Sequence, residues 1–161
     1  MELRRLRSDE GLAYRAVRLR ALELDPDAYG QTLDEALADP EQTWHDLATS
    51  VSDEWGPRAM FVVDRGDGDL AGTLYAAISR GEPYACQLGA MWVDPDLRAT
   101  GWADALMETA LAWAAGNGAP YATLWHRLGN ERAGRFYERH GFQQSGILDD
   151  PGEAMELYRV L

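Results

Sequence analysis

The sequence predicts one domain of the α+β class (mixed α/β), with a mostly antiparallel sheet flanked by helices. The chain has 161 residues, the length of a single domain. At 46% hydrophobic residues, including six Trp, it can bury a core. Its predicted elements follow the order β-α-α-β-β-β-α-β-α-β-β, in which antiparallel hairpins precede a strand–helix–strand unit. No internal repeat or linker divides the sequence, so residues 1–161 are expected to form one domain.

The N-terminal residues predict a short strand followed by a helix. The strand is expected over residues 2–7, and Ser8 is a typical helix N-cap with two acidic residues in the turn after it. Apolar residues then recur at helical spacing at Leu12, Ala16 and Leu19. The helix is expected to end before Asp25 and Pro26, because a residue that precedes proline disfavours helical geometry.

A second helical stretch is expected after this break. It is interrupted at Asp39–Pro40 and resumes toward Leu47 and Val51. Trp44 and Leu47 are expected to supply its buried face.

Three strands bounded by turn residues follow the helices. They are expected at residues 59–64, 70–79 and 84–93. A Gly/Asp-rich turn at 65–69 joins the first two strands, Gly81-Glu82-Pro83 joins the next two, and Asp94–Pro95 ends the third.

The C-terminal half alternates helices and strands. A helix is expected over 101–115, with one apolar face made by Ala103, Leu106, Met107, Ala110 and Trp113. Gly116-Asn117-Gly118 stops it. A strand at 121–126, a helix at 131–140 with Gly141 as its C-terminal cap, and strands at 142–147 and 153–161 complete the chain.

Composition excludes several functional classes. The formal net charge is −12 and the pI is about 4.5, so the chain repels nucleic acid and anionic membranes at long range, and neither is expected as a partner. A cationic acceptor is compatible with this charge, although acidity is also common in proteins merely for solubility. Residues 1–10 lack a signal-peptide core and no apolar run could span a bilayer. A cytoplasmic protein is therefore expected.

Cysteine and histidine usage predicts neither a disulfide nor a metal site. Cys86 is the single cysteine, so no intrachain disulfide forms, and no Cys-His-Asn order marks it as a nucleophile. It is expected to be a buried structural thiol. His45 and His140 are widely spaced and have no ligand partners, so no metal is expected.

The stretch from Val93 to Leu106 predicts a pyrophosphate site. A strand ends, a short loop of small residues follows, and a helix begins near Gly101. The first N–H groups of a helix have no internal partners, and with the helix dipole they favour an anion. Gly101 and Ala103 leave room for a phosphate beside the backbone, and Arg98 adds a positive charge.

The loop matches one of the known phosphate-binding patterns. The G-x-G-x-x-G and G-x-x-x-x-G-K-[ST] motifs are absent. Arg98, Gly101 and Ala103 instead form R-x-x-G-x-A, which resembles the coenzyme A loop [QR]-x-x-G-x-[GA] of the GNAT superfamily. Members often carry Gly after the first position, where this chain has Ala99.

A second signature strengthens the resemblance. Residues 130–142 are similar to the GNAT pattern N-x-x-A-x-x-F-Y-x-x-x-G-F at every fixed position. Both signatures stand in the expected order and on the expected elements, and the resemblance is sharp over residues 84–147. It is weaker in the N-terminal half, where residues 18–22 and 26–30 look like the acceptor-side helices of the family.

The resemblance implies a GNAT-type fold and an N-acetyltransferase that uses acetyl-CoA as cosubstrate and no metal. The coenzyme residues that it implies are Met91, Trp92, Val93, Arg98, Ala99, Thr100, Gly101, Trp102, Ala103 and Asn130. The loop would bind the pyrophosphate, and the strand edge at Met91–Val93 would pair with the pantetheine arm and hold the thioester oxygen. Asn130 would bind the coenzyme, serve as a helix N-cap, or do both.

Tyr137 is the residue expected to act as general acid. A tyrosine at this spacing is more often a core aromatic, and the family match is what favours a phenol that protonates the leaving thiolate. The general base is open. Strand residues 84–93 contain no acid, Trp125 stands where some relatives carry Glu, and His126 is the nearby imidazole. Strand alternation points His126 away from Trp125, so a water chain to Glu82 or Glu35 is as plausible.

The expected reaction is direct transfer of an acetyl group to a primary amine of a small molecule or peptide. The alternatives are a longer acyl donor, a hydroxyl acceptor, or a catalytically inactive coenzyme A-binding sensor of the same fold. The acceptor pocket would come from the first two helices, the loop between them and the turn at 81–84, with Tyr29, Trp44 and Trp55 as lining or core residues. A homodimer is possible, since relatives often dimerise.

Overall fold

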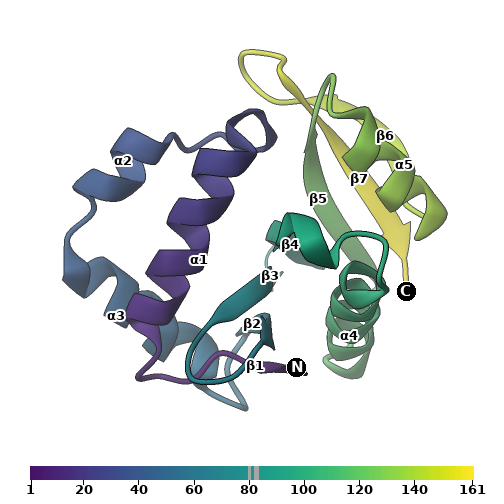
Figure 1. The fold of residues 1–161 in the computed structure, drawn as a ribbon. Helices are drawn as coiled ribbons and strands as arrows, with labels where there is room; N and C mark the ends of the chain where they lie inside the picture. Colours follow the sequence, from purple (N-terminus) through teal and green to yellow (C-terminus); the bar gives the residue numbers. More distant parts are fainter. Residues whose placement is uncertain (80, 82–83) are drawn as a thin grey trace.

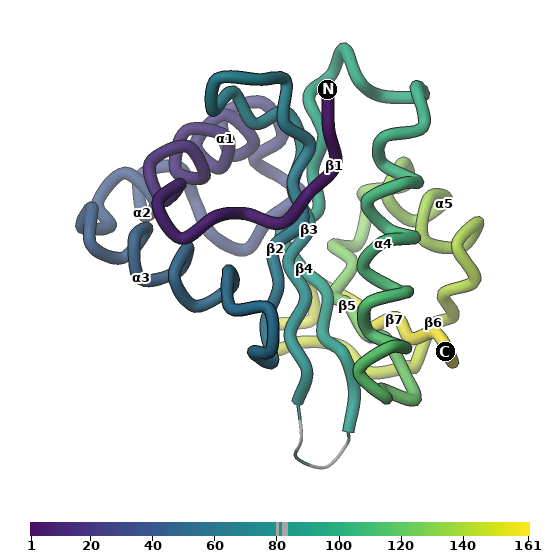
Figure 2. The backbone as a smooth tube through the Cα atoms, turned by 90° about the horizontal axis from the view of Figure 1, so that it is seen from below, coloured from purple at the N-terminus to yellow at the C-terminus, as the bar shows by residue number. Residues whose placement is uncertain are grey.

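A computed structural model describes residues 1–79, 81 and 84–161. A central sheet separates two groups of helices, with α1, α2 and α3 on one face and α4 and α5 on the other (Figures 1 and 2). The predicted class is confirmed: the fold is a mixed α+β arrangement with a mostly antiparallel sheet.

The observed elements follow the predicted order, with the second helical stretch divided at Asp39–Pro40 into two helices. The helices are α1 (Gly11–Leu24), α2 (Leu33–Ala38), α3 (Glu41–Ser52), α4 (Trp102–Gly116) and α5 (Glu131–Arg139). The strands are β1 (Glu2–Arg5), β2 (Arg58–Asp64), β3 (Leu70–Ser79), β4 (Ala85–Val93), β5 (Tyr121–Arg127), β6 (Gln143–Leu148) and β7 (Ala154–Val160). Among the described residues, no helix has the length and hydrophobicity required to cross a bilayer. The turn expected at 81–83 includes Glu82 and Pro83, which lie outside the described residues.

The sheet order is β1-β2-β3-β4-β5-β7-β6, and β4 and β5 are its parallel neighbours. Their register contains only the pairs Cys86–Ala122 and Gln87–Thr123, after which the two strands separate. In the part of β4 beyond these pairs, an extra residue interrupts the ladder to β3, and Ala90 there adopts a positive φ of 49°. This β-bulge turns the end of β4 away from β5 and opens a space between the strands.

Two cores hold the helices against the sheet. Side chains of β2 alternate between them: Met60 and Val62 pack with α1, α2 and α3, whereas Phe61 and Val63 pack with α4. Because both faces of the strand are buried, it reads as a continuous apolar run. Cys86 is fully buried in the second core, as expected, and desolvation raises the pKa of its thiol to about 12.

The expected start of α1 at Ser8 is wrong. The helix begins at Gly11 after the N-cap residue Glu10, and the acidic residues precede it. The Glu10 carboxylate accepts hydrogen bonds from the backbone N–H of Arg7 at 2.8 Å and from the Arg4 guanidinium at 2.6 Å. The Glu10 carboxylate therefore holds the turn before α1 in place, because both the Arg7 amide and the Arg4 side chain on β1 can reach this carboxylate.

The expected apolar stripe of α1 lies mainly on its outer side. Leu12 and Ala16 are exposed and Leu19 is half-buried. The face toward the core is made by Tyr14, Val17 and Ala21, and the Tyr14 ring lies 5.8 Å from that of Trp44 on α3. Trp44 is buried as expected, so the aromatic contact between the helices decides which side of α1 faces inward.

At Gly11, α1 lies close against the backbone of α3. A Cβ at this position would lie 2.8 Å from the backbone oxygen of Trp44. We therefore expect Gly11→Ala to lower the free energy of unfolding by about 1–3 kcal/mol, although Gly→Ala in a helix ordinarily stabilises. Gly116→Ala in α4 is the matched control, since its Cβ would meet nothing within 4 Å. Denaturant unfolding measures both, and an unchanged or higher stability of Gly11→Ala would contradict the predicted clash.

Candidate active site

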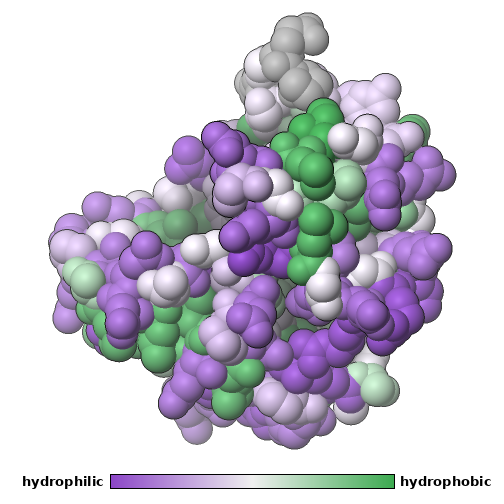
Figure 3. All heavy atoms as spheres, turned by 90° about the horizontal axis from the view of Figure 1, so that it is seen from above, coloured by the Kyte–Doolittle hydropathy of each residue, from purple (hydrophilic) through white to green (hydrophobic). Residues whose placement is uncertain are grey.

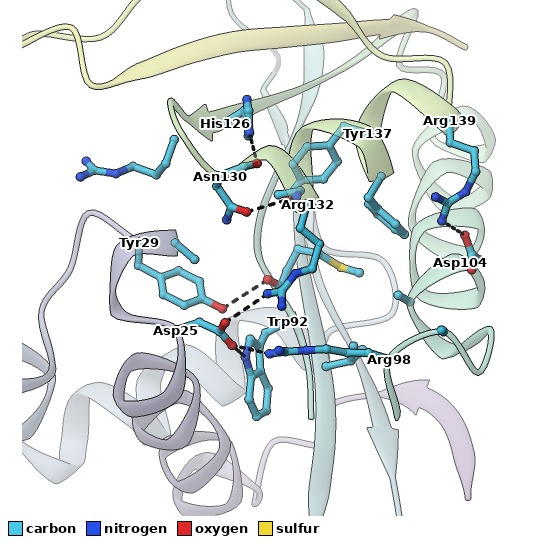
Figure 4. A pocket seen from close by; sticks show the side chains of 18 of the residues that line it. Asp25, Tyr29, Trp92, Arg98, Asp104, His126, Asn130, Arg132, Tyr137 and Arg139 are labelled. Carbon is cyan, nitrogen blue, oxygen red and sulfur yellow. Dashed lines mark hydrogen bonds and ion pairs between the residues drawn. The ribbon is translucent and has the colours of Figure 1, made fainter. Parts of the chain in front are cut away.

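A cavity of about 350 Å³ lies where β4 and β5 separate, between the N-terminus of α4 and helix α5 (Figure 4). Most of the residues predicted at the coenzyme or at the reacting atoms line it: Met91, Trp92, Val93, Arg98, Ala99, Gly101, Ala103, His126, Asn130 and Tyr137. Thr100 and Trp102 are not lining residues. The Thr100 hydroxyl donates to the backbone oxygen of Leu97 at 2.6 Å, and Trp102 packs against the core.

The N-terminus of α4 presents backbone N–H groups without a side-chain cap. Its N-cap residue is Gly101, with φ at 92°, and no side chain hydrogen-bonds to the first turn. Ala99 in the same loop has φ at 62°, a left-handed conformation that costs an alanine roughly 1 kcal/mol relative to glycine. This geometry explains why glycine suits the position where the chain departs from the GNAT pattern.

The cavity is cationic, in contrast to the acidic chain around it. Four arginines and two aspartates line it: Arg98, Arg127, Arg132, Arg139, Asp25 and Asp104. Asp104 accepts hydrogen bonds from Arg139 at 3.0 Å and from His140 at 2.8 Å. The hydrogen bond from Arg139 is the main cause of a lowered Asp104 pKa. A local excess of guanidinium groups in a chain of net charge −12 favours a strongly anionic ligand at this place.

Asp25 joins the walls of the cavity. Its carboxylate accepts hydrogen bonds from the Trp92 indole at 2.8 Å and from Arg132 at 3.1 Å, and it pairs with Arg98 (Figure 4). Burial of the carboxyl acts to raise its pKa, but the hydrogen bonds and the charge of Arg98 outweigh burial and hold the pKa below its usual value. The sequence indicated Asp25 only as a helix stop, because its partners lie far away in the chain.

Tyr137 lies on α5 at the cavity wall. Asn130 caps this helix by accepting a hydrogen bond from the Ala133 N–H at 3.2 Å, as one of its two expected roles required. The Tyr137 ring packs edge-on against Phe142 at 6.0 Å, and desolvation raises the pKa of its hydroxyl to about 12. The phenol therefore stays protonated at neutral pH and can donate a proton.

His126 and Trp125 point to opposite sides of β5, as strand alternation predicts. The His126 Nε2 lies 2.8 Å from the backbone oxygen of Asn130 and so donates to it. Its ring packs on α5 at Gly134, where a Cβ would come within 3.1 Å of it. Trp125 is 41% exposed and lies at the boundary of the first cavity and a second one.

The second cavity has a volume of about 430 Å³ and shares a wall with the first. Residues common to both are Ala28, Tyr29, Met91, Trp125, Arg127 and Tyr137. The Tyr29 hydroxyl donates to the Met91 backbone oxygen at 3.3 Å, which places the loop after α1 against β4. Seen from above, hydrophilic side chains surround the hollow between the α1–α3 side and the α5 side of the molecule (Figure 3).

Of the described residues suggested for the acceptor side, only some line a cavity. Tyr29 lines both cavities, Trp44 is buried in the core, and Trp55 is 90% exposed and lines neither cavity. The Glu35 carboxylate accepts a hydrogen bond from the Thr32 backbone N–H in a helix cap and lines neither cavity. Glu82 lies outside the described residues.

The polar residues of the second cavity that the sequence did not indicate are Tyr75, Gln87, Arg127 and Asp149. Asp149 follows β6, and its carboxylate accepts a hydrogen bond from the Ala154 N–H at 2.7 Å. The strand pairing of β6 with β7 brings it to the site, and no local motif marks it.

Comparison with solved structures supports the fold. The chain is similar to a GNAT-family acetyltransferase from Streptococcus pneumoniae, with a TM-score of 0.78, 16% identity and 99% of each chain covered. It is also similar to PaiA N-acetyltransferase from Thermoplasma acidophilum in complex with coenzyme A, with a TM-score of 0.81, 14% identity and 99% and 98% of the two chains covered. At these identities the likeness concerns the fold alone.

Sequence comparison identifies the family. Uncharacterized N-acetyltransferases from Mycobacterium bovis and Mycobacterium tuberculosis are 38% identical over 90 residues, which are 56% of this chain and 56% of theirs. The chain thus matches just over half the length of these relatives. The model of the acetyltransferase (GNAT) family matches residues 29–142, which include both cavity-forming signatures. The chain therefore belongs to the GNAT acetyltransferase family.

Proposed function

We propose that the protein is an acetyl-CoA-dependent N-acetyltransferase that transfers the acetyl group directly to a primary amine. The observation that carries the proposal is the arginine-rich cavity at the uncapped N-terminus of α4, between the separated strands β4 and β5. A similar fold binds coenzyme A in the protein from Thermoplasma acidophilum, and the mycobacterial relatives are named as N-acetyltransferases.

Residues of the cavity fit the diphosphate and the pantetheine arm of the coenzyme. The N–H groups at the start of α4, together with Arg98, would hold the diphosphate. The edge of β4 at Met91–Val93 has left its pairing with β5 and would pair with the amide-containing pantetheine arm. The side chain of Asn130 stands at the start of α5, where the two strands diverge.

The chain would contribute two functions to the transfer. The thioester supplies the activated acetyl group, and a backbone N–H at the bulge of β4 would stabilise the charge that develops on its oxygen. Tyr137 would donate its proton to the departing thiolate. Because the phenol has a pKa of about 12, this acid remains protonated over the whole neutral and mildly alkaline range.

The activity is tested by incubating the protein with acetyl-CoA and a panel of primary amines and following thiol release. Amine-dependent release of coenzyme A is expected. Tight coenzyme binding with no release across a broad panel would instead favour the inactive sensor, and absence of coenzyme binding would contradict the proposal as a whole.

Removing the charge of Arg98 should weaken coenzyme binding. We expect Arg98→Gln to raise the Kd for coenzyme A about tenfold or more, since a hydrogen-bonded guanidinium–phosphate contact is lost. The difference should shrink as salt is added. Arg135→Gln is the matched control, because Arg135 lies on α5 outside both cavities and pairs with Glu131. Calorimetric titration measures both variants, and equal Kd values would argue against a diphosphate beside Arg98.

Removing the Tyr137 hydroxyl should slow chemistry without weakening binding. We expect Tyr137→Phe to keep the Kd for coenzyme A and to lower kcat about 10²- to 10⁴-fold. In the wild type, ionisation of this phenol should produce no loss of kcat below about pH 11, because its pKa is about 12 and the acid is lost only as the pH rises through that value. Tyr121→Phe on β5 serves as control, since Tyr121 lies outside both cavities. Unchanged turnover in Tyr137→Phe would remove this residue from the mechanism.

His126 is the proposed base, through its second ring nitrogen. Nε2 donates to Asn130, which leaves Nδ1 as the nitrogen that accepts a proton from the amine, directly or through water. We expect His126→Ala to lower kcat/KM about 10²-fold or more while leaving the Kd for coenzyme A unchanged. An unchanged kcat/KM in this variant would exclude the histidine, and Asp149→Asn would then be the next variant to measure.

A further inference from the structure

The second cavity contains charged groups that acetyl transfer itself does not use. We propose that the acceptor is a primary amine that also carries a carboxylate, and that Arg18 binds this carboxylate. The inference rests on the proposed function and specifies the class of its second substrate. It differs from what net charge suggests, since a chain of charge −12 attracts cationic acceptors at long range.

Arg18 is an oriented cation without a matching anion. It lies on α1, half-buried, and its Nε and Nη2 donate to the side-chain oxygen of Gln31 at 3.3 and 3.1 Å. Its guanidinium carbon lies 4.4 Å from the centre of the Tyr29 ring. Within residues 1–79, 81 and 84–161, no carboxylate forms an ion pair with Arg18. A guanidinium fixed by a neutral amide and an aromatic ring, and not neutralised, is a ready receptor for a carboxylate.

The other charges of the cavity suit a zwitterionic amine. Arg127 is paired with Glu153 at 2.8 Å, so its charge is already balanced. Asp149 is the carboxylate among the described lining residues. One wall therefore offers a positive charge and another a negative charge, which complements an amino group and a carboxylate on the same small molecule.

Tyr29 connects the Arg18 site with the reacting end of the cavity. The ring of Tyr29 lies against Arg18, and its hydroxyl donates to the Met91 backbone oxygen on β4 at 3.3 Å. Tyr29, Met91 and Tyr137 line both cavities. A carboxylate on Arg18 would thus place the amine of a compact acceptor beside the strand edge where the thioester is expected.

The test compares matched pairs of acceptors: α- and ω-amino acids beside their carboxamides, with acetyl-CoA as donor and coenzyme A release as the readout. For the wild type we expect at least one amino acid to exceed its carboxamide in kcat/KM by about tenfold or more. Arg18→Gln should lower kcat/KM for that amino acid by about 10- to 100-fold, mainly through KM, and leave the carboxamide within about twofold. The kcat/KM of Arg18→Lys for that amino acid should lie between the values of the wild type and of Arg18→Gln, because lysine keeps the positive charge but lacks the planar guanidinium group.

Arg15→Gln is the matched control, since Arg15 lies on the same helix and lines neither cavity. It should behave as the wild type toward both members of each pair. An equal loss for amino acid and carboxamide in Arg18→Gln would mean that Arg18 only supports the fold, and this would overturn the inference. A wild-type enzyme that uses carboxamides as well as amino acids would overturn it too, with the acetyltransferase activity intact. Absence of release with every amine would overturn the proposed function, and the inference with it.

Discussion

The site depends on one carboxylate, that of Asp25 at the end of α1. It joins the strand β4 through Trp92, the loop before α4 through Arg98 and the helix α5 through Arg132, although these segments lie far apart in the chain. Hydrogen bonds to charged groups contribute about 1.5–3 kcal/mol each when they are buried, and an exposed partner such as Arg132 contributes less, so Trp92 and Arg98 do most to fix the loop that carries Tyr29. The side chain is 17% exposed and its pKa is lowered. This stabilisation is complete above the ordinary pKa of an aspartate and is lost as the pH falls toward the lower, folded-state value.

The sheet supplies the opening that this network surrounds. The parallel pairing of β4 with β5 ends after Gln87, and the bulge at Ala90 bends β4 away. The strained residues Ala90 and Ala99 both lie beside the cavities, at φ values of 49° and 62°. Backbone strain of this kind persists only where the surrounding structure holds it, and here it shapes the edge of β4 that lines the cavities and the turn that precedes α4. The bulge in β4 thus accounts both for the free edge of this strand and for the space between β4 and β5.

Much of this arrangement could be predicted from sequence because its signals are local. Leu70–Ser79 was predicted to the residue, since turn residues bound it, and the two signatures identify α4, α5 and half of the residues that line the first cavity. What failed depends on side-chain contacts that no pattern in the sequence marks. Glu10 replaces Ser8 at the start of α1 because Arg4 and the Arg7 amide meet it, and the inner face of α1 is chosen by the contact of Tyr14 with Trp44. Asp25 and Asp149 reach the site only through tertiary packing, which no spacing in the sequence records.

The central claim is that the arginine-lined cavity binds the diphosphate of an acyl-coenzyme A and directs its thioester toward Tyr137. A structure determined from crystals of the protein grown in the presence of acetyl-CoA tests this claim most directly. We expect the diphosphate at the N–H groups that begin α4, the pantetheine arm along β4, and the sulfur within hydrogen-bond reach of the Tyr137 hydroxyl. A coenzyme bound elsewhere, or one whose sulfur lies far from Tyr137, would contradict it.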